Sequence, residues 1–164
     1  MKKILVTGGG GFIGKEICSF FSNNNFKVLS IVRSNFNKKK KYNIKKIDLT
    51  KKIKINFSPD IIIHCASEMP TKGETGRKMY NNNIKMMKEL LLFAEQKNVA
   101  YFFNMSSMSI YGNIKRSPVK VSSSSISPNL YGQSKIINEK LLDQYCYKKK
   151  ILCISFRLPG VVGK

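Results

Sequence analysis

The sequence predicts an α/β fold in which helices cover a doubly wound, parallel sheet. Two observations carry this prediction. Short apolar runs of strand length alternate along the chain with longer runs whose apolar residues recur at helical spacing. A glycine-rich turn also separates the first of these strands from the first helix. In such a fold the ligand lies at the carboxyl ends of the strands, where the strand order reverses.

Six strands and three helices are expected. The first strand ends at four glycines, and the helix after it carries apolar side chains three and four residues apart. Pro59 introduces the fourth strand, and residues 117–128 are rich in serine and proline, which is typical of a loop. The expected strands cover residues 3–7, 28–32, 44–48, 60–64, 99–105 and 151–157, and the helices cover residues 12–23, 81–97 and 130–147.

Length and composition fit one globular domain. The chain has 164 residues, of which 42% are hydrophobic, and this is enough to bury a core. No apolar run has the length of a membrane span, and no signal peptide develops after Lys2 and Lys3, so we expect a cytoplasmic protein. A single histidine excludes a multi-histidine metal centre, and the spacing of the four cysteines favours buried free thiols over disulfides or zinc.

The formal net charge of +21 raises the question of nucleic-acid or membrane binding. The basic residues are nearly all lysine, whereas arginine is the side chain that binds bases and phosphates through two parallel hydrogen bonds. Asparagine and isoleucine are also abundant, which is typical of coding bias in an AT-rich genome. We therefore expect neither a nucleic-acid nor a membrane partner.

The turn from Thr7 to Gly14 predicts a phosphate-binding loop. Gly8 permits a tight turn, Gly11 lets the backbone approach a pyrophosphate, and Gly14 allows close packing of the helix. The N–H groups at the start of the helix face the same ligand. Because this pattern occurs between a strand and a helix at the start of the chain, it indicates dinucleotide binding rather than a merely structural turn.

The residue after the second strand bears on the choice of dinucleotide. A carboxylate there would bind the 2′-hydroxyl of NAD, whereas this chain has Val32 followed by Arg33. A guanidinium suits the 2′-phosphate of NADP, although Arg33 could equally be a solvated surface residue. We expect NADP or NAD, with NADP favoured.

Tyr131 and Lys135 form a Y-x-x-x-K pattern that places both side chains on one face of a helix. An ammonium near a phenol lowers the phenol's pKa, so Tyr131 is expected to act as a general base or acid. Lys135 can also hold the nicotinamide ribose, and Ser107, at the end of the fifth strand, can donate a hydrogen bond to the substrate oxygen.

Several further segments, in unbroken order, resemble motifs of one family. Residues 7–14 are similar to its T-G-x-x-G-x-x-G loop and residues 64–67 to its H-x-A-[AG] turn. Residues 106–112 are similar to its S-S-x-x-V-Y-G segment, and residues 157–163 to its R-x-x-x-V-[YF]-G strand end. With Tyr131 and Lys135, the whole chain resembles the extended short-chain dehydrogenases/reductases, also called the NAD-dependent epimerase/dehydratase family.

The resemblance implies a Rossmann fold and a Ser–Tyr–Lys triad of Ser107, Tyr131 and Lys135, with Ser106 beside it. It also implies that Asp48 and Leu49 contact the adenine and that Asn83 holds the active-site backbone. The positions expected to bind the cofactor are Gly8, Gly11, Phe12, Ile13, Gly14, Arg33, Asp48, Leu49, Cys65, Ala66, Ser67, Asn83, Ser106, Tyr131 and Lys135.

Departures from the family narrow the expected reaction. Met108 and Ser109 stand where family dehydratases carry an Asp-Glu pair, and Val32 stands where NAD-binding epimerases carry Asp. The family continues into a C-terminal substrate domain, whereas this chain stops at Lys164. Residues 1–164 are therefore expected to be an NAD(P)-binding domain truncated after the sixth strand, from an epimerase or reductase acting on nucleotide-sugars, and inactive alone.

Two other functions stay open, namely a non-catalytic dinucleotide-binding or sensing module and, more remotely, a basic nucleic-acid binder. An association is also expected. In the helix at residues 81–97, one apolar face would cover the sheet, formed by Ile84, Met87, Leu91 and Ala94. A second face would point outward, formed by Met86, Leu90 and Phe93. In the resembled family this helix and the helix at 130–147 pair across a two-fold axis, so we expect a homodimer.

Overall fold

A computed structural model describes residues 1–34, 40–70, 76–115 and 117–163. Its six strands form one parallel sheet in the order β3-β2-β1-β4-β5-β6. The order reverses between β1 and β4, as expected for a doubly wound fold. The strands are β1 (Lys3–Thr7), β2 (Lys27–Val32), β3 (Asn43–Lys46), β4 (Ile61–His64), β5 (Tyr101–Ser107) and β6 (Leu152–Leu158).

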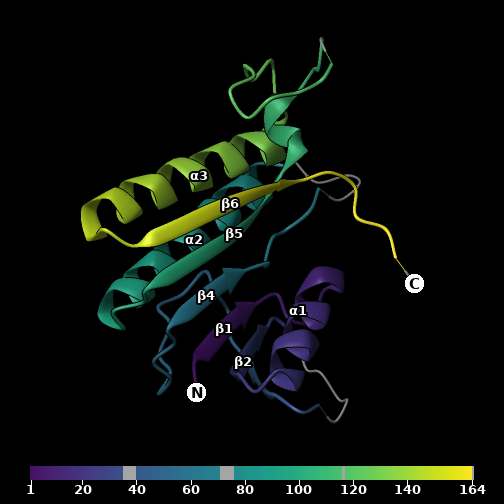
Figure 1. The fold of residues 1–164 in the computed structure, drawn as a ribbon. Coiled ribbons are helices and arrows are strands. Elements are labelled where there is room, and N and C mark those ends of the chain that lie inside the picture. Colours follow the sequence, from purple (N-terminus) through teal and green to yellow (C-terminus); the bar gives the residue numbers. More distant parts are fainter. Residues whose placement is uncertain (35–39, 71–75, 116, 164) are drawn as a thin grey trace.

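Helices cover both faces of the sheet (Figure 1). They are α1 (Phe12–Asn23), α2 (Arg77–Gln96) and α3 (Leu130–Lys149), with a short 3₁₀ helix η1 (Met108–Tyr111) after β5. Because side chains alternate across a strand, Ile4 and Val6 pack in a cluster with Cys18 of α1, whereas Leu5 packs in a cluster with the residues of α2. The predicted fold class is confirmed, and so is every expected strand and helix, with ends that differ by a few residues.

Two of these differences affect the site. Strand β3 ends at Lys46, so Asp48 lies in the turn beyond the strand rather than at its last position. Helix α2 begins at Arg77, four residues before the predicted start. Helix η1 was not predicted, because four residues are too few to show a helical period.

The apolar pattern of α2 was interpreted wrongly. Met86, Leu90 and Phe93 were expected to point outward, but all three are buried in the same core cluster as Met87, Leu91 and Ala94. The reason is that α2 lies beside α3 as well as on the sheet, so its second apolar face is covered within the chain. The sequence argument for a homodimer through these three residues therefore does not hold.

The cysteine prediction also needs a correction. Cys18 and Cys65 are free thiols, but Cys146 and Cys153 form a disulfide. Helix α3 ends at Lys149, and Lys150 then adopts a left-handed conformation that turns the chain back into β6. This reversal brings the two cysteine Cα atoms to 6.1 Å, a proximity that spacing along the sequence does not reveal.

One face of the sheet's β6 edge is open. Leu152, Ile154 and Phe156 point to the same side of β6, and each is at least 39% exposed. Among the described residues, no helix covers this side of β5 and β6, since α1 packs mainly against β1 and β2. In the described part of the chain, no helix combines the length and the apolar character that crossing a bilayer requires.

Arg157 joins four parts of the structure next to the site. Its Nη2 donates to Oε2 of Glu139 on α3 at 2.8 Å, and its Nε donates to the same carboxylate at 3.2 Å. Its Nη1 donates to the Tyr111 hydroxyl at 2.8 Å and to the Val121 carbonyl at 2.7 Å. Arg157 thereby connects β6 to α3, to η1 and to the loop before α3.

Arg157→Ala is expected to lower the free energy of unfolding by about 3 kcal/mol, because the Glu139 carboxylate would stay buried without its partner. The double variant Arg157→Met with Glu139→Leu should lose much less, since it leaves no unpaired charge. Lys149→Ala, which removes the more exposed ion pair with Glu95, serves as the control. Urea unfolding measures the free energy of unfolding of all three variants. Equal losses for Arg157→Ala and Lys149→Ala would contradict the stabilising role assigned to Arg157.

Candidate functional site

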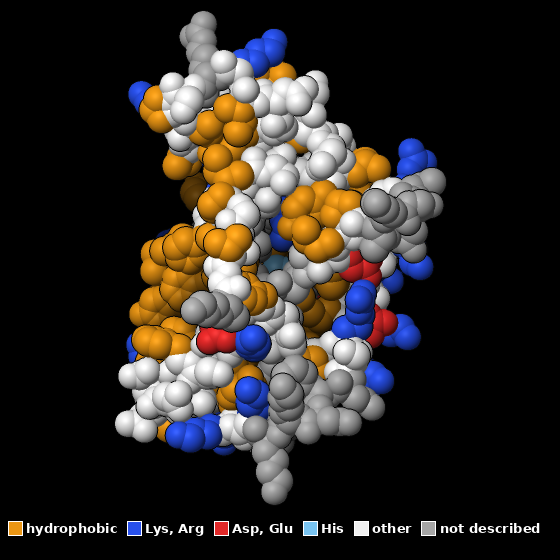
Figure 2. Space-filling view, turned by 90° about the vertical axis from the view of Figure 1, so that its right-hand side faces the viewer, with side chains coloured by type: hydrophobic (Ala, Val, Ile, Leu, Met, Phe, Trp, Pro, Cys, Tyr) orange, Lys and Arg blue, Asp and Glu red, His pale blue; other side chains and the backbone are white. Residues whose placement is uncertain are grey.

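Two clefts meet at the carboxyl edge of the sheet, where hydrophobic side chains gather around a hollow (Figure 2). The first, of about 340 Å³, lies between the ends of β2, β3 and β4. The second, of about 620 Å³, lies between the start of α1, the end of β5 and the start of α3. Both clefts are lined by Gly8, Gly11, Cys65 and Ser67, so together they form one trough that crosses the glycine loop.

The glycine loop has the geometry that its sequence predicted. Gly8 has φ +70°, and a Cβ there would lie 2.7 Å from the backbone nitrogen of Ala66. A Cβ on Gly14 would collide with the carbonyl oxygen of Gly8, so α1 can pack against the loop only because Gly14 has no side chain. Gly9 is a third tight position that sequence reasoning missed, because its collision would be with Ser30, a residue distant in sequence.

Gly11 differs from these glycines because a Cβ there would meet only one protein atom, the Gly8 carbonyl oxygen, at 3.3 Å. It is the N-cap of α1, and as a glycine it has no side chain with which to make a capping hydrogen bond. The N–H groups of Phe12, Ile13 and Gly14 start the helix without carbonyl partners inside it. The space beside Gly11 and these N–H groups fit the phosphates of a dinucleotide.

Hydrogen bonds fasten the end of β1 to the end of β4. The Thr7 hydroxyl lies 2.7 Å from Nδ1 of His64 and accepts a bond from the Ala66 N–H at 3.3 Å. Burial lowers the pKa of His64 to about 3, so its imidazole is neutral and structural. Burial also raises the pKa of the Cys65 thiol to about 12, which makes it a poor nucleophile. The predicted positions Cys65, Ala66 and Ser67 all line the first cleft.

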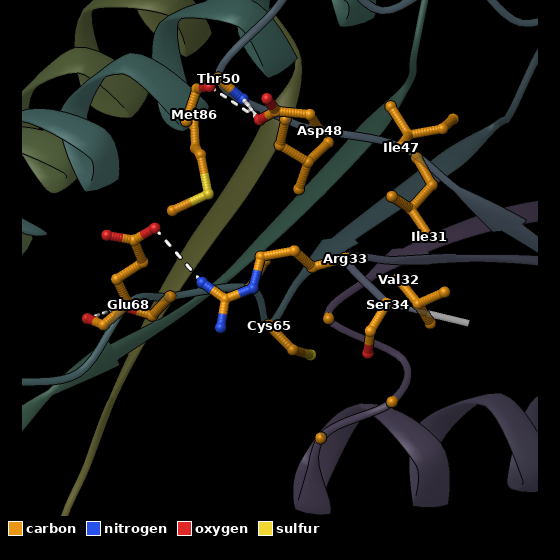
Figure 3. Close-up of a pocket in the computed structure, with 16 residues that line it drawn as sticks. Ile31, Val32, Arg33, Ser34, Ile47, Asp48, Thr50, Cys65, Glu68 and Met86 are labelled. Carbon is orange, nitrogen blue, oxygen red and sulfur yellow. Dashed lines mark hydrogen bonds and ion pairs between the residues drawn. The ribbon is translucent and has the colours of Figure 1, made fainter. Parts of the chain in front are cut away.

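The first cleft holds the residues predicted to contact the adenosine half of a dinucleotide: Arg33, Asp48 and Leu49 (Figure 3). Asp48 accepts hydrogen bonds from the N–H and hydroxyl of Thr50, at 2.9 and 2.7 Å. These bonds lower the pKa of Asp48, which is therefore ionised at neutral pH. Leu49 is 5% exposed and belongs to the core as well as to the cleft wall.

Arg33 reaches across the first cleft to a residue that sequence reasoning missed (Figure 3). Its Nη1 lies 3.3 Å from Oε1 of Glu68, in the loop after β4. Asn82 donates a hydrogen bond to the other oxygen of Glu68 at 3.0 Å. The only sequence cue to Glu68 was its position four residues after the strand-end histidine, in a chain with nine acidic residues.

Asn83 connects the loop after β4 to α3. Its Oδ1 accepts from the Glu68 N–H at 2.8 Å, and its Nδ2 donates to the Glu68 carbonyl at 3.1 Å. Nδ2 also lies 3.4 Å from Oγ of Ser134, whose hydroxyl donates to the Tyr131 carbonyl at 2.7 Å. Asn83 thus holds backbone at the site, as the resemblance implied, and it does so from a position that is 1% exposed.

The second cleft brings together Ser106, Ser107, Tyr131 and Lys135. Helix α3 begins at Leu130, after Asn129 accepts a capping hydrogen bond from the Gly132 N–H, and so fixes Tyr131 in the first turn. Lys135 is 3% exposed, and its Nζ donates to the Met105 carbonyl at 3.0 Å. Burial lowers the pKa of Lys135 to about 8.

The predicted lowering of the Tyr131 pKa is wrong for this structure. Burial raises the pKa of Tyr131, and a hydrogen bond with Ser67 opposes the rise only in part. The Lys135 Nζ lies 5.4 Å from the centre of the Tyr131 ring and is bonded to the Met105 carbonyl, so its charge is directed at the backbone rather than at the phenol oxygen.

The two serines at the end of β5 differ in their partners. Ser107 caps η1 by accepting from the Ser109 N–H at 3.1 Å, and its hydroxyl donates to the Ser109 hydroxyl at 3.0 Å. Ser109 is one of the two departures from the family's dehydratases. It contacts Ser107 directly, and sequence reasoning did not assign it a role in the site. The Ser106 hydroxyl is buried without a hydrogen-bond partner in the part of the chain that the structure describes.

Comparisons with known proteins identify the family. Residues 4–164 match the model of the NAD dependent epimerase/dehydratase family. The sterol-4-alpha-carboxylate 3-dehydrogenase, decarboxylating, of Dictyostelium discoideum is 29% identical over 99% of this chain and 54% of that protein. A putative UDP-glucose 4-epimerase of Methanocaldococcus jannaschii is 26% identical over 98% of this chain and 56% of that protein. The chain thus spans about half the length of these relatives.

Solved structures show the same fold. A UDP-galactose 4-epimerase superposes with a TM-score of 0.87 at 22% identity, over 94% of this chain and 55% of that one. The UDP-glucuronic acid 4-epimerase from Bacillus cereus, in complex with NAD, superposes with a TM-score of 0.83 at 24% identity, over 98% of this chain and 57% of that one. Neither the family description nor these structures support the NADP preference predicted from Arg33. The match across nearly the whole chain establishes that the protein belongs to the NAD-dependent epimerase/dehydratase family.

Proposed function

We propose that residues 1–164 bind a nicotinamide dinucleotide across the glycine loop and form the cofactor side of a sugar-nucleotide epimerase or reductase. The observation that carries the proposal is the continuous trough formed by the two clefts. The adenosine half fits the first cleft, beside Asp48. The pyrophosphate fits beside Gly11 and the N–H groups of α1, and the nicotinamide half fits the second cleft, beside Tyr131 and Lys135.

The residues of the second cleft can move and hold a proton. The cofactor supplies hydride transfer when it is bound. Tyr131 would exchange a proton with the substrate oxygen, and Ser107 would donate a hydrogen bond to that oxygen once its hydroxyl turns away from Ser109. Lys135 is the cationic side chain among the described residues that line this cleft, and it would hold the hydroxyls of the nicotinamide ribose.

The substrate side is proposed to need more chain than these residues provide. Positioning a substrate over the cofactor supplies a large share of an enzyme's rate, and the chain spans about half the length of the relatives it matches. We therefore propose that residues 1–164 alone bind the dinucleotide without converting a sugar nucleotide. Mass spectrometry would detect conversion of a sugar nucleotide by this chain alone. If that conversion depends on Tyr131, residues 1–164 are sufficient for catalysis and the proposal is wrong.

The proposal predicts that Gly11→Ala weakens dinucleotide binding roughly tenfold or more without unfolding the protein. Gly11 has ordinary φ and ψ values, −80° and 171°, so alanine fits the backbone, while the new Cβ would fill the space beside the phosphates. Gly76→Ala, at the start of α2, is the matched control, because its Cβ would meet only side-chain atoms. Titration with NADH by fluorescence measures the effect. If the folded wild-type chain binds neither NADH nor NADPH, the proposed function is wrong.

A second prediction concerns the proton transfer and applies to a protein that carries both halves. Tyr131→Phe should lower kcat by roughly a hundredfold or more while dinucleotide affinity stays nearly unchanged, because only the phenol oxygen is lost. Lys135→Ala should reduce both kcat and dinucleotide affinity, since Lys135 is proposed to contact the ribose. Single-turnover kinetics and cofactor titration separate the two effects. Retention of most activity by Tyr131→Phe would remove the proposed role of Tyr131.

We further propose a homodimer through α2 and α3, as the family resemblance implies. The exposed large hydrophobic residues on the described parts of these helices are Leu92, Leu130 and Tyr147, at 53%, 38% and 91% exposed. Leu92→Lys should shift the equilibrium toward monomer in sedimentation velocity at roughly 50 µM. Leu152→Lys, at an equally exposed position on β6, should leave it unchanged. A wild-type chain that is monomeric at this concentration would contradict the proposal.

A further inference from the structure

The first cleft is acidic although the protein is strongly basic. Its described lining contains one cation, Arg33, and two carboxylates, Asp48 and Glu68. The chain as a whole has 30 lysines and arginines against nine acidic residues. The exposed Lys51 lies 3.9 Å from Asp48 but does not line the cleft. A ligand that enters this cleft therefore contacts two carboxylates directly, whereas the charge of Lys51 lies outside the described lining.

Glu68 is the fixed member of its ion pair with Arg33. Its backbone is held on both sides by Asn83, and Asn82 donates to its carboxylate. The Glu68 side chain is 26% exposed, whereas that of Arg33 is 83% exposed. Because the exposed partner has the freedom to move and the held partner does not, Glu68 sets the direction in which Arg33 points across the cleft (Figure 3).

This arrangement matters for the choice between the two dinucleotides. NADP differs from NAD by a 2′-phosphate, which adds up to about two negative charges. Arg33 uses its Nη1 for Glu68, so a 2′-phosphate would have to share the guanidinium with that carboxylate, in a cleft lined by two carboxylates and one cation. The 2′-hydroxyl of NAD requires no such sharing.

We propose that Glu68 is a specificity-determining residue that makes the cleft select NAD(H) over NADP(H). It acts by engaging Arg33 and by repelling a 2′-phosphate. The inference rests on the proposed function, since it presumes that a dinucleotide binds here. It explains why an arginine after β2 does not by itself make this an NADP site.

Measuring the dissociation constants of NADH and NADPH for the 164-residue chain tests the inference. The wild-type chain should bind NADH more tightly. Glu68→Gln keeps the side chain's size and removes its charge, and it should shift the ratio of the two constants toward NADPH by roughly tenfold, the effect of one charge-assisted hydrogen bond. Glu95→Gln makes the same change of net charge on the far end of α2 and should leave the ratio unchanged.

The Arg33→Ala background separates the two parts of the mechanism. Arg33 is exposed, so its removal should not disturb folding, and Glu68→Gln should then shift the ratio by a smaller factor, through the loss of repulsion alone. The inference is overturned if the wild-type chain prefers NADPH, or if Glu68→Gln leaves the ratio unchanged. It is also overturned if Glu68→Gln shifts the ratio equally with and without Arg33. Failure of the folded chain to bind either dinucleotide contradicts the proposed function instead, which keeps the two failures distinct.

Discussion

The site depends on the close approach of the loop after β1 to the loop after β4. Gly8 lies so near the backbone of Ala66 that no side chain fits between them, and its φ of +70° is one that other residues rarely adopt. Thr7 fastens the two loops through His64 and the Ala66 N–H. Because β1 and β4 are the neighbours at which the strand order reverses, this contact fixes the floor of both clefts.

From this floor, hydrogen bonds extend to the helix that carries Tyr131. Asn83 holds the backbone of Glu68 and approaches Ser134, which in turn bonds to the Tyr131 carbonyl. Helices α2 and α3 hold this series of hydrogen bonds in place because they bury apolar side chains against each other and against the sheet. The buried ammonium of Lys135 destabilises the fold, because burial disfavours its charged form and lowers its pKa to about 8. A buried polar group at such a cost is typical of a functional site rather than of a core.

The basic composition is a property of the whole chain, whereas the acidic character of the first cleft is a local property. Net charge sums side chains that mostly project into solvent, where ions screen them. The cleft's charge comes from three side chains that the ends of β2, β3 and β4 bring together. A prediction of ligand preference from overall charge, or from Arg33 alone, therefore leaves out the carboxylates that line the cleft.

The sequence by itself determined the order of strands and helices along the chain, the glycine loop and the pairing of Tyr131 with Lys135 on one helix face. Each of these follows from local patterns: apolar periods of two and 3.6 residues, glycines where a Cβ would not fit, and a tyrosine and a lysine one helical turn apart. These patterns act within a few residues of each other, so they can be recognised without coordinates.

Only the tertiary structure decided which distant side chains meet. It buried Met86, Leu90 and Phe93 between α2 and α3, joined Cys146 to Cys153, and paired Arg33 with Glu68. It also reversed the expected pKa shift of Tyr131, because burial raises the pKa of the phenol. The physical reason is the same in each case. The distance between two side chains far apart in sequence depends on strand register and helix packing, and burial sets the charge of an ionisable group as strongly as its neighbours do.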